Sequence, residues 1–220
     1  MIFCSIGRYK QLYAPEHQNW YDTSMKNRPE PPFRFKAGTI RTSCYNTEYD
    51  VNNLEGRTMA FTTHSDTLDL SAYRAAAEPK KLNDFSVRRP DIAFAIDVCT
   101  WFLHKQLLLG WPSITHDRIA QTQQPGFRGG ITDLSTPIDG LRNAALTLLH
   151  ELTHTQTGGL LDDLNGSKLP PGVPDCYGWK CVQLLKDPSN SDNVAMLGLA
   201  LHIWSMGYYV DQDGNIIGRP

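Results

Sequence analysis

The sequence predicts an α+β fold that is mainly helical in its C-terminal half and carries a small sheet formed by its N-terminal half. Apolar residues recur at helical spacing in three segments after residue 137. Short runs rich in Thr, Ile, Tyr and Phe, which are typical of strands, lie between residues 38 and 63. The 220 residues are 40% hydrophobic and 20% charged, which is enough for one domain with a core of its own.

The N-terminal elements are expected to be short. Residues 1–37 are predicted to be irregular, because prolines interrupt them and no apolar period persists. Strands are predicted over 38–49 and 57–63, followed by a short helix that Pro79 ends. These runs supply the small sheet.

The middle of the chain is predicted to form one helix and one long loop. Apolar residues recur at helical spacing from Asp91 to about Leu109, which predicts a helix. Residues 110–135 are rich in Gly, Pro, Gln and Thr and predict a loop. A loop of this length in a compact domain is expected to border a cleft.

The clearest helix starts at Asp139, which is the expected N-cap, and carries an apolar stripe as far as Leu152. The pair Gly158-Gly159 is expected to end it. Two further helices and a hairpin with a turn at Asp213-Gly214 are predicted to follow, over 177–185, 192–206 and 208–220.

The first of these helices carries a motif with chemical meaning, His150-Glu151-Leu152-Thr153-His154. On a helix, residues i and i+4 lie on one face, so His150 and His154 can both bind one Zn²⁺ ion. Around the helix axis, Glu151 is about 100° from His150, so it is not expected to bind the same metal ion. It is predicted to be the catalytic base that takes a proton from a water, as in zinc hydrolases.

A catalytic zinc site needs a third protein ligand and leaves one position for water. The downstream candidates in this sequence are three aspartates and one histidine: Asp162, Asp163, Asp175 and His202. Asp163 follows His154 by nine residues, which is short enough for a loop to return it to the metal. Asp192 is expected to cap the last helix, with a contact to a zinc-binding histidine as the alternative.

Two further segments complete a resemblance. After the H-E-x-x-H motif the chain reads Asp175-Cys176-Tyr177-Gly178 and then Asn190-Ser191-Asp192-Asn193. In this order of elements the chain resembles the deuterolysin (aspzincin) family of fungal zinc metallopeptidases. That family carries G-T-x-x-D-x-x-Y-G, whereas here the Gly-Thr is absent, one residue separates Asp175 from Tyr177, and Pro174 stands at the family's ligand position.

The resemblance implies a single zincin-like domain over 1–220, with the zinc-site helices within 137–207. It implies zinc bound by the two histidines and Asp175, with Asp163 as the alternative third ligand. It also implies endopeptidase activity in which Tyr177 stabilises the oxyanion. The alternatives are a zincin-fold enzyme that acts on a small molecule in a fungal biosynthetic pathway, and a non-catalytic zinc-binding or effector-like protein.

Charge and cysteine content limit which binding partners and which cellular compartment we expect. The net charge of −2 gives no reason to expect nucleic acid, and the absence of a long apolar run gives none to expect a membrane. The N-terminus does not have the features of a secretory signal, so we expect an intracellular protein, or a secreted one if the chain is a processed mature form. Five cysteines fit two disulfides and one free thiol, or five free thiols. The sequence indicates no oligomeric state.

Overall fold

A computed structural model of the chain describes residues 59–64, 94–129, 135–164 and 176–220, together with short strands in the first 36 residues. The chain forms two compact units, residues 1–105 and 106–220, and each is described by itself. The described residues contain six α-helices and small sheets, which confirms the α+β class. The single zincin-like domain stays a prediction.

The N-terminal unit contains two three-stranded sheets. Its strands are β1 (Ile2–Phe3), β2 (Tyr9–Gln11), β3 (Asn19–Asp22), β4 (Arg34–Lys36), β5 (Ala60–His64) and β6 (Phe94–Val98). In the first sheet β6 is central, parallel to β1 and antiparallel to β5, and in the second sheet β3 lies antiparallel between β2 and β4.

Strand β5 confirms the strand predicted over 57–63. The predicted strand over 38–49 and the helix before Pro79 lie outside the described residues. Four short strands lie within 1–37, where the sequence predicts irregular structure. None of them is longer than four residues, so the alternation of apolar and polar side chains is too brief to recognise.

The helix predicted over 91–109 is wrong in its first half, where the chain forms β6. Helix α2 (Thr100–Leu108) accounts for the second half. Successive residues of β6 from Ala95 to Val98 are all buried, because this strand is central in its sheet. A strand buried on both faces shows no alternation, and a short apolar run cannot be told from a helix by its period.

The loop predicted over 110–135 contains two short helices, α3 (His116–Thr122) and α4 (Pro125–Gly129). The Thr115 hydroxyl caps α3 by accepting a hydrogen bond from the Arg118 amide at 3.2 Å. A helix of seven residues spans about two turns, so it shows little of the apolar period that identifies a helix in a sequence.

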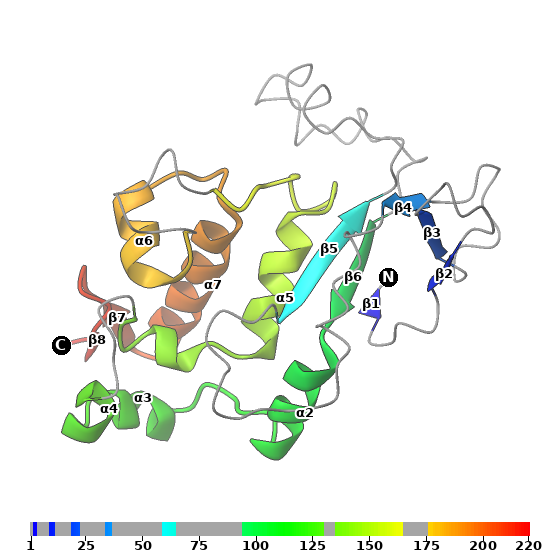
Figure 1. The fold of residues 1–220 in the computed structure, drawn as a ribbon. Helices are drawn as coiled ribbons and strands as arrows, with labels where there is room; N and C mark the ends of the chain where they lie inside the picture. Colours follow the sequence, from blue (N-terminus) through cyan, green and yellow to red (C-terminus); the bar gives the residue numbers. More distant parts are fainter. Residues whose placement is uncertain are drawn as a thin grey trace. The chain divides into compact units, whose positions relative to one another are not determined.

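The C-terminal unit is built around two long helices, α5 and α7, which pack against each other (Figure 1). Its elements after α4 are the 3₁₀ helix η5 (Asp139–Leu141), α5 (Ala144–Thr153), α6 (Gly178–Leu185), α7 (Ser191–Ser205), β7 (Tyr208–Val210) and β8 (Ile216–Gly218). The helices predicted over 177–185 and 192–206 are confirmed. The antiparallel β7–β8 pair confirms the hairpin, which turns at Gly214 with a positive φ of 77°.

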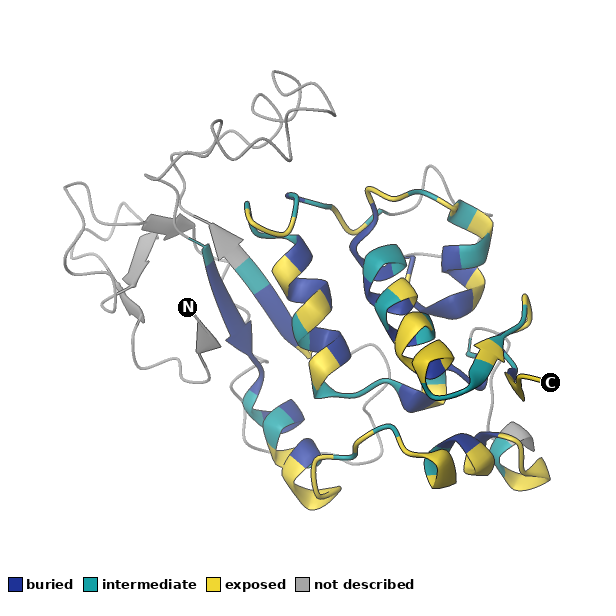
Figure 2. Ribbon diagram, turned by 180° about the vertical axis from the view of Figure 1, so that it is seen from behind, coloured by how far each residue is buried: buried dark blue, intermediate teal, exposed yellow. Residues whose placement is uncertain are grey.

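Buried apolar side chains from nearly every element of this unit form its core. Buried and exposed residues follow one another around α5 and α7, so each helix turns one face to this core (Figure 2). The core residues are Ile119, Ile138, Leu141, Leu146, Trp179, Val182, Ala195, Met196, Leu199, Ile203 and Ile216. The core therefore fixes α5, α6 and α7 relative to one another.

Asp139 is not the N-cap of the predicted helix, because α5 begins five residues later at Ala144. Asn143 is the N-cap, and its side chain accepts a hydrogen bond from the Leu146 amide at 3.1 Å. The Asp139 carboxylate instead accepts hydrogen bonds from the backbone and hydroxyl of Thr136 and from the Trp179 amide. It joins η5 to the start of α6.

Cys176 and Cys181 form a disulfide, and Cys99 is also disulfide-bonded. Of the two arrangements expected for the five cysteines, five free thiols is therefore excluded. None of the described helices is long and apolar enough to cross a membrane.

Candidate metal centre

The two histidines of the H-E-x-x-H motif converge at the end of α5. Thr153 is the last residue of the helix and His154 is its C-cap, so the spacing of i and i+4 is kept. The Nε2 atoms of His150 and His154 lie 3.3 Å apart. His150 is buried, whereas His154 is partly exposed.

A tight turn after α5 brings Asp163 back to these histidines. Gly159, with φ of 108°, and Leu160, with φ of 56°, reverse the chain, and the Leu161 amide then donates to the Thr153 carbonyl at 3.0 Å. Asp163 Oδ1 thereby lies 3.1 Å from His150 Nε2 and 3.5 Å from His154 Nε2. The loop of nine residues from His154 to Asp163 therefore folds back to the histidines, as its length allowed.

The three atoms form a triangle whose size fits a zinc ion. Its edges are 3.1, 3.3 and 3.5 Å. With bonds of about 2.0–2.1 Å at tetrahedral angles, neighbouring ligand atoms lie about 3.3 Å apart. His150, His154 and Asp163 could therefore hold a metal ion without rearrangement, and they are the only such group of three among the described residues.

Each histidine is oriented by an acceptor at its other ring nitrogen. Nδ1 of His150 lies 3.2 Å from Asp192 Oδ1, and Nδ1 of His154 lies 2.8 Å from the Leu161 carbonyl oxygen. The Ser191 hydroxyl is also 3.1 Å from His154 Nδ1. Carboxylate and carbonyl oxygens only accept hydrogen bonds, so both Nδ1 atoms carry the proton. In the neutral rings both Nε2 atoms then offer lone pairs to a metal.

Asp192 is the centre of the hydrogen-bond network behind the site. It is fully buried, and its two oxygens accept hydrogen bonds from both terminal nitrogens of Arg142 at 2.8 and 3.1 Å. The Gly178 amide donates to it at 2.6 Å. Gly178 has a φ of 82°, which a residue with a side chain rarely adopts, and this conformation starts α6 beside Asp192.

These contacts set the charges of the metal-free site. Burial alone would raise the pKa of Asp192, but the hydrogen bond from His150 and the charge of Arg142 outweigh it and lower the pKa to about 2. Burial alone would lower the pKa of His150, but the hydrogen bonds to Asp163 and Asp192 outweigh it and raise the pKa to about 9. A metal would therefore displace a proton from His150 at neutral pH.

Tyr177 contacts two of the three candidate ligands, and Glu151 follows one of them, His150, directly in sequence. The Tyr177 hydroxyl donates to Asp163 Oδ2 at 2.9 Å, and its ring centroid is 5.7 Å from that of His150. Glu151 follows His150 on α5 and is buried. Tyr177 thus contacts the outer oxygen of the carboxylate whose other oxygen faces the histidines.

The structure brings together most of the residues predicted for the site. Asp163, the alternative third ligand, lies with the histidines, whereas Asp175 lies outside the described residues and stays a prediction. Asp162 is not in the metal group, and His202 is exposed near the end of α7. Asp192 does not cap α7 with its side chain, so that prediction is wrong, and the alternative contact to His150 is confirmed.

Sequence reasoning missed Arg142 and Ser191. Arg142 lies outside the helix that carries the motif, so no helical periodicity connects it to the histidines. Ser191 lies in the Asn-x-Asp segment, which pointed to this part of the chain but not to the contact between Ser191 and His154. Both contacts depend on how α5 packs against α7, which no local pattern encodes.

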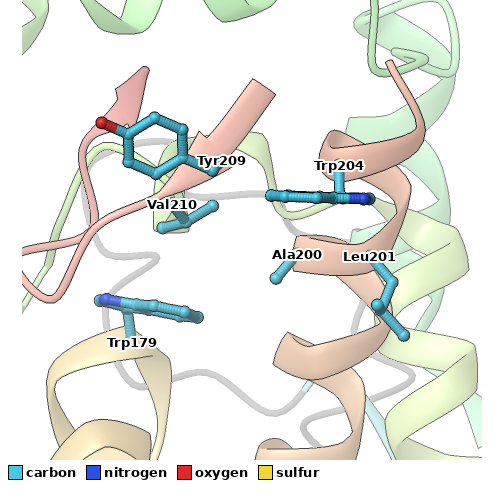
Figure 3. A pocket seen from close by; sticks show the side chains of 6 residues that line it. All are labelled: Trp179, Ala200, Leu201, Trp204, Tyr209 and Val210. Carbon is cyan, nitrogen blue, oxygen red and sulfur yellow. The ribbon is translucent and has the colours of Figure 1, made fainter. Parts of the chain in front are cut away.

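A separate apolar pocket with a volume of about 380 Å³ lies at the other end of α7. Figure 3 shows its aromatic walls, with Trp179 from α6 on one side and Trp204 from α7 on the other. None of the three candidate metal ligands lines it. The pocket is therefore separate from the metal group, and its walls include the exposed side chains of Leu201, Trp204 and Tyr209.

No protein-family model, curated protein or solved structure matches the chain. The resemblance to the deuterolysin family therefore rests on the sequence motifs, and the case for a metal centre rests on the geometry of this chain's own residues.

Proposed function

We propose that the chain is a zinc hydrolase in which His150, His154 and Asp163 hold the metal, and more specifically a zinc-dependent endopeptidase. The observation that carries the proposal is the triangle of 3.1, 3.3 and 3.5 Å between the three ligand atoms. Two imidazoles and one carboxylate form a ligand set that catalytic zinc sites use, with the fourth position left for water.

A zinc ion held there would polarise a carbonyl group and make a water acidic near neutral pH. Glu151, next to His150 on α5, is proposed to take the proton of that water and to pass it to the leaving amine. Asp192 and the Leu161 carbonyl keep both imidazoles in the tautomer that binds metal.

Tyr177 is proposed to have two roles at different stages. Its hydroxyl fixes Asp163 in the structure as it stands. Because the side chain is 45% exposed, it can also turn toward a substrate and donate to a developing oxyanion. These roles would make Tyr177 important to turnover more than to metal binding.

Two observations favour a peptide as the substrate and an extracellular setting. The Asp163 side chain is 41% exposed, so one edge of the metal group faces solvent, where an extended substrate would approach. The disulfide bonds at Cys99 and between Cys176 and Cys181 are typical of proteins from an oxidising compartment. A secreted endopeptidase accounts for both.

The direct test is casein cleavage by the full chain with one equivalent of zinc. A chelator should abolish cleavage and added zinc should restore it. Glu151→Gln should retain zinc and lower kcat by at least about 100-fold, because a positioned general base contributes about 10²–10⁴-fold.

His202→Gln is the matched control, because this exposed histidine on α7 lies outside the metal group. It should leave zinc content and cleavage unchanged. Zinc-loaded protein that cleaves neither casein nor a broad peptide panel would contradict the endopeptidase proposal.

A further inference from the structure

Residues 189–192 span the start of α7, and the first two residues of the helix, Ser191 and Asp192, contact the two histidines of the site. Asn190 directly precedes these two residues; it is fully buried, and its side chain does not cap α7. We propose that Asn190 is a positioning residue that holds Asp163 at the metal. This inference rests on the proposed zinc centre and not on its substrate.

The backbone on one side of Asp163 is paired with this segment. Asp162 and Asn190 form a parallel β-bridge. In this bridge the Asp162 amide donates to the Ser189 carbonyl at 3.0 Å, and the Ser191 amide donates to the Asp162 carbonyl at 2.8 Å. The residue before the candidate ligand is thus fixed by two backbone hydrogen bonds.

The residue on the other side of Asp163 is fixed by the Asn190 side chain. The Leu164 amide donates to Asn190 Oδ1 at 3.0 Å. The same carboxamide donates through Nδ2 to Asn193 Oδ1 at 2.8 Å, which fixes its orientation. With both neighbours held, the backbone of Asp163 cannot swing away from the histidines without breaking three hydrogen bonds.

A second connection runs from Asn190 to the outer oxygen of Asp163. The Leu164 carbonyl accepts a hydrogen bond from the Cys176 amide at 3.2 Å, and Asn190 Nδ2 lies 3.5 Å from the Cys176 carbonyl. The next residue, Tyr177, donates its hydroxyl to Asp163 Oδ2. Asn190 therefore supports Asp163 through its backbone and through its carboxylate.

Only a side chain with both an acceptor and a donor satisfies this arrangement. The Leu164 amide needs the acceptor, and the Asn193 carboxamide oxygen needs the donor. Removing the acceptor leaves a partly buried amide without its partner, and the loop that carries Asp163 must then move to reach water.

The test compares zinc affinity between the full chain and Asn190→Ser. Serine is a favourable residue at a helix N-cap, so α7 should still begin normally, but its hydroxyl is too short to reach the Leu164 amide. Zinc dissociation constants are measured by competition with a chromophoric chelator, and Co²⁺ absorption reports the ligand geometry. We expect binding to weaken by about 10–100-fold, as when a residue that orients a metal ligand is lost.

The matched control is Ser189→Ala, because this exposed side chain bonds Asp187, and the backbone of residue 189 keeps its hydrogen bond with the Asp162 amide. It should keep zinc affinity within about twofold even if it lowers thermal stability. If Asn190→Ser fails to fold, Asn190→Asp is the second variant. It keeps the acceptor for Leu164, and the Asn193 carboxamide can turn to donate to the new carboxylate, so zinc binding should be nearly that of the unmodified chain. An Asn190→Asp loss as large as that expected for serine would overturn the proposal.

A double-mutant cycle separates positioning from general destabilisation. If Asn190 acts through Asp163, Asn190→Ser should add less than about twofold to the loss caused by Asp163→Ala. Additive losses, or unchanged affinity and Co²⁺ spectrum in Asn190→Ser, would overturn the inference. Failure to cleave casein would contradict the endopeptidase proposal alone, because none of these readouts depends on turnover.

Discussion

Among single residues, Asp192 is the buried negative charge that pairs with Arg142 and His150 in the site. Its carboxylate accepts hydrogen bonds from His150, Arg142 and Gly178, three parts of the chain that are otherwise separate. A buried carboxylate is stable only with such partners, and each partner is oriented in return. Asp192 thus links the start of α7 to the face of α5 that carries the candidate metal ligands.

Because the pKa of Asp192 is lowered from 3.8 to about 2, the unfolded metal-free chain binds more protons than the folded one between these pH values. The contribution of Asp192 to stability is therefore complete above pH 4 and is lost as pH falls toward 2. Asp192→Asn should lower the free energy of unfolding by roughly 2 kcal/mol at pH 7.

Denaturant unfolding of both proteins with chelator present, at several pH values from 7 down to 2, measures this effect. The difference between them should shrink as pH falls through the window below 4. A difference that stays constant down to pH 2 would show that the lowered pKa of Asp192 does not stabilise the fold.

The spacing of His150 and His154 predicted that the two rings would lie on one face of a helix, and the structure places their Nε2 atoms 3.3 Å apart. The candidate for the third ligand could not be chosen from spacing in the same way. Asp163 reaches the histidines through a turn and a β-bridge, and Asp175 was favoured only by its place beside Tyr177-Gly178. Loop geometry decides such contacts, and a linear motif does not contain it.

Among the elements, the turn that follows α5 brings Asp163 to the two histidines. It must end the helix and reverse the chain within a few residues, so that Asp163 returns to the face it has just left. A Cβ on Gly158 would overlap the Leu152 carbonyl oxygen, and the nearby Thr153 Cα is only 2.6 Å away. The turn therefore has no room for a side chain at this position.

Gly158→Ala should consequently destabilise the chain by about 1–3 kcal/mol, the usual cost of forcing extra atoms into a packed site. It should also weaken zinc binding, because the displaced turn carries Asp163. Denaturant unfolding and a zinc titration measure the two effects. Gly126→Ala in α4 is the control, since nothing lies within 4 Å of its added Cβ.

Unchanged stability and unchanged zinc affinity in Gly158→Ala would contradict this account of the turn. A loss in Gly126→Ala of the same size would show that the effect is not specific to it. Exposed substitutions of this kind usually stay within about 0.5 kcal/mol.

Among the elements, the ones with long apolar stripes were predicted and the short ones were not. Helices α6 and α7 and the terminal hairpin lie where the sequence placed them. Strand β6 was taken for a helix because burial on both faces removes its alternation. Helices α3 and α4 are too short to show a period, and their start depends on a cap at Thr115.

At the scale of the whole molecule, the C-terminal unit contains the complete candidate metal group. Its core joins α5, α6 and α7, and the hydrogen-bond network of the site connects the same three helices through Asp192. Core packing and site geometry therefore depend on each other. The α+β class followed from composition and pattern, whereas this coupling is a property of the folded unit.

The central claim is that one zinc ion binds to His150, His154 and Asp163. Titration of the metal-free full chain with zinc, against a chromophoric chelator, tests it most directly. We expect one zinc per chain, and a loss of more than about 100-fold in affinity for His154→Ala and for Asp163→Ala, since even residues that only orient a ligand contribute 10–100-fold. Asp175→Ala should bind as the unmodified chain does. Substoichiometric zinc in the unmodified chain, or a loss in Asp175→Ala with none in Asp163→Ala, would contradict it.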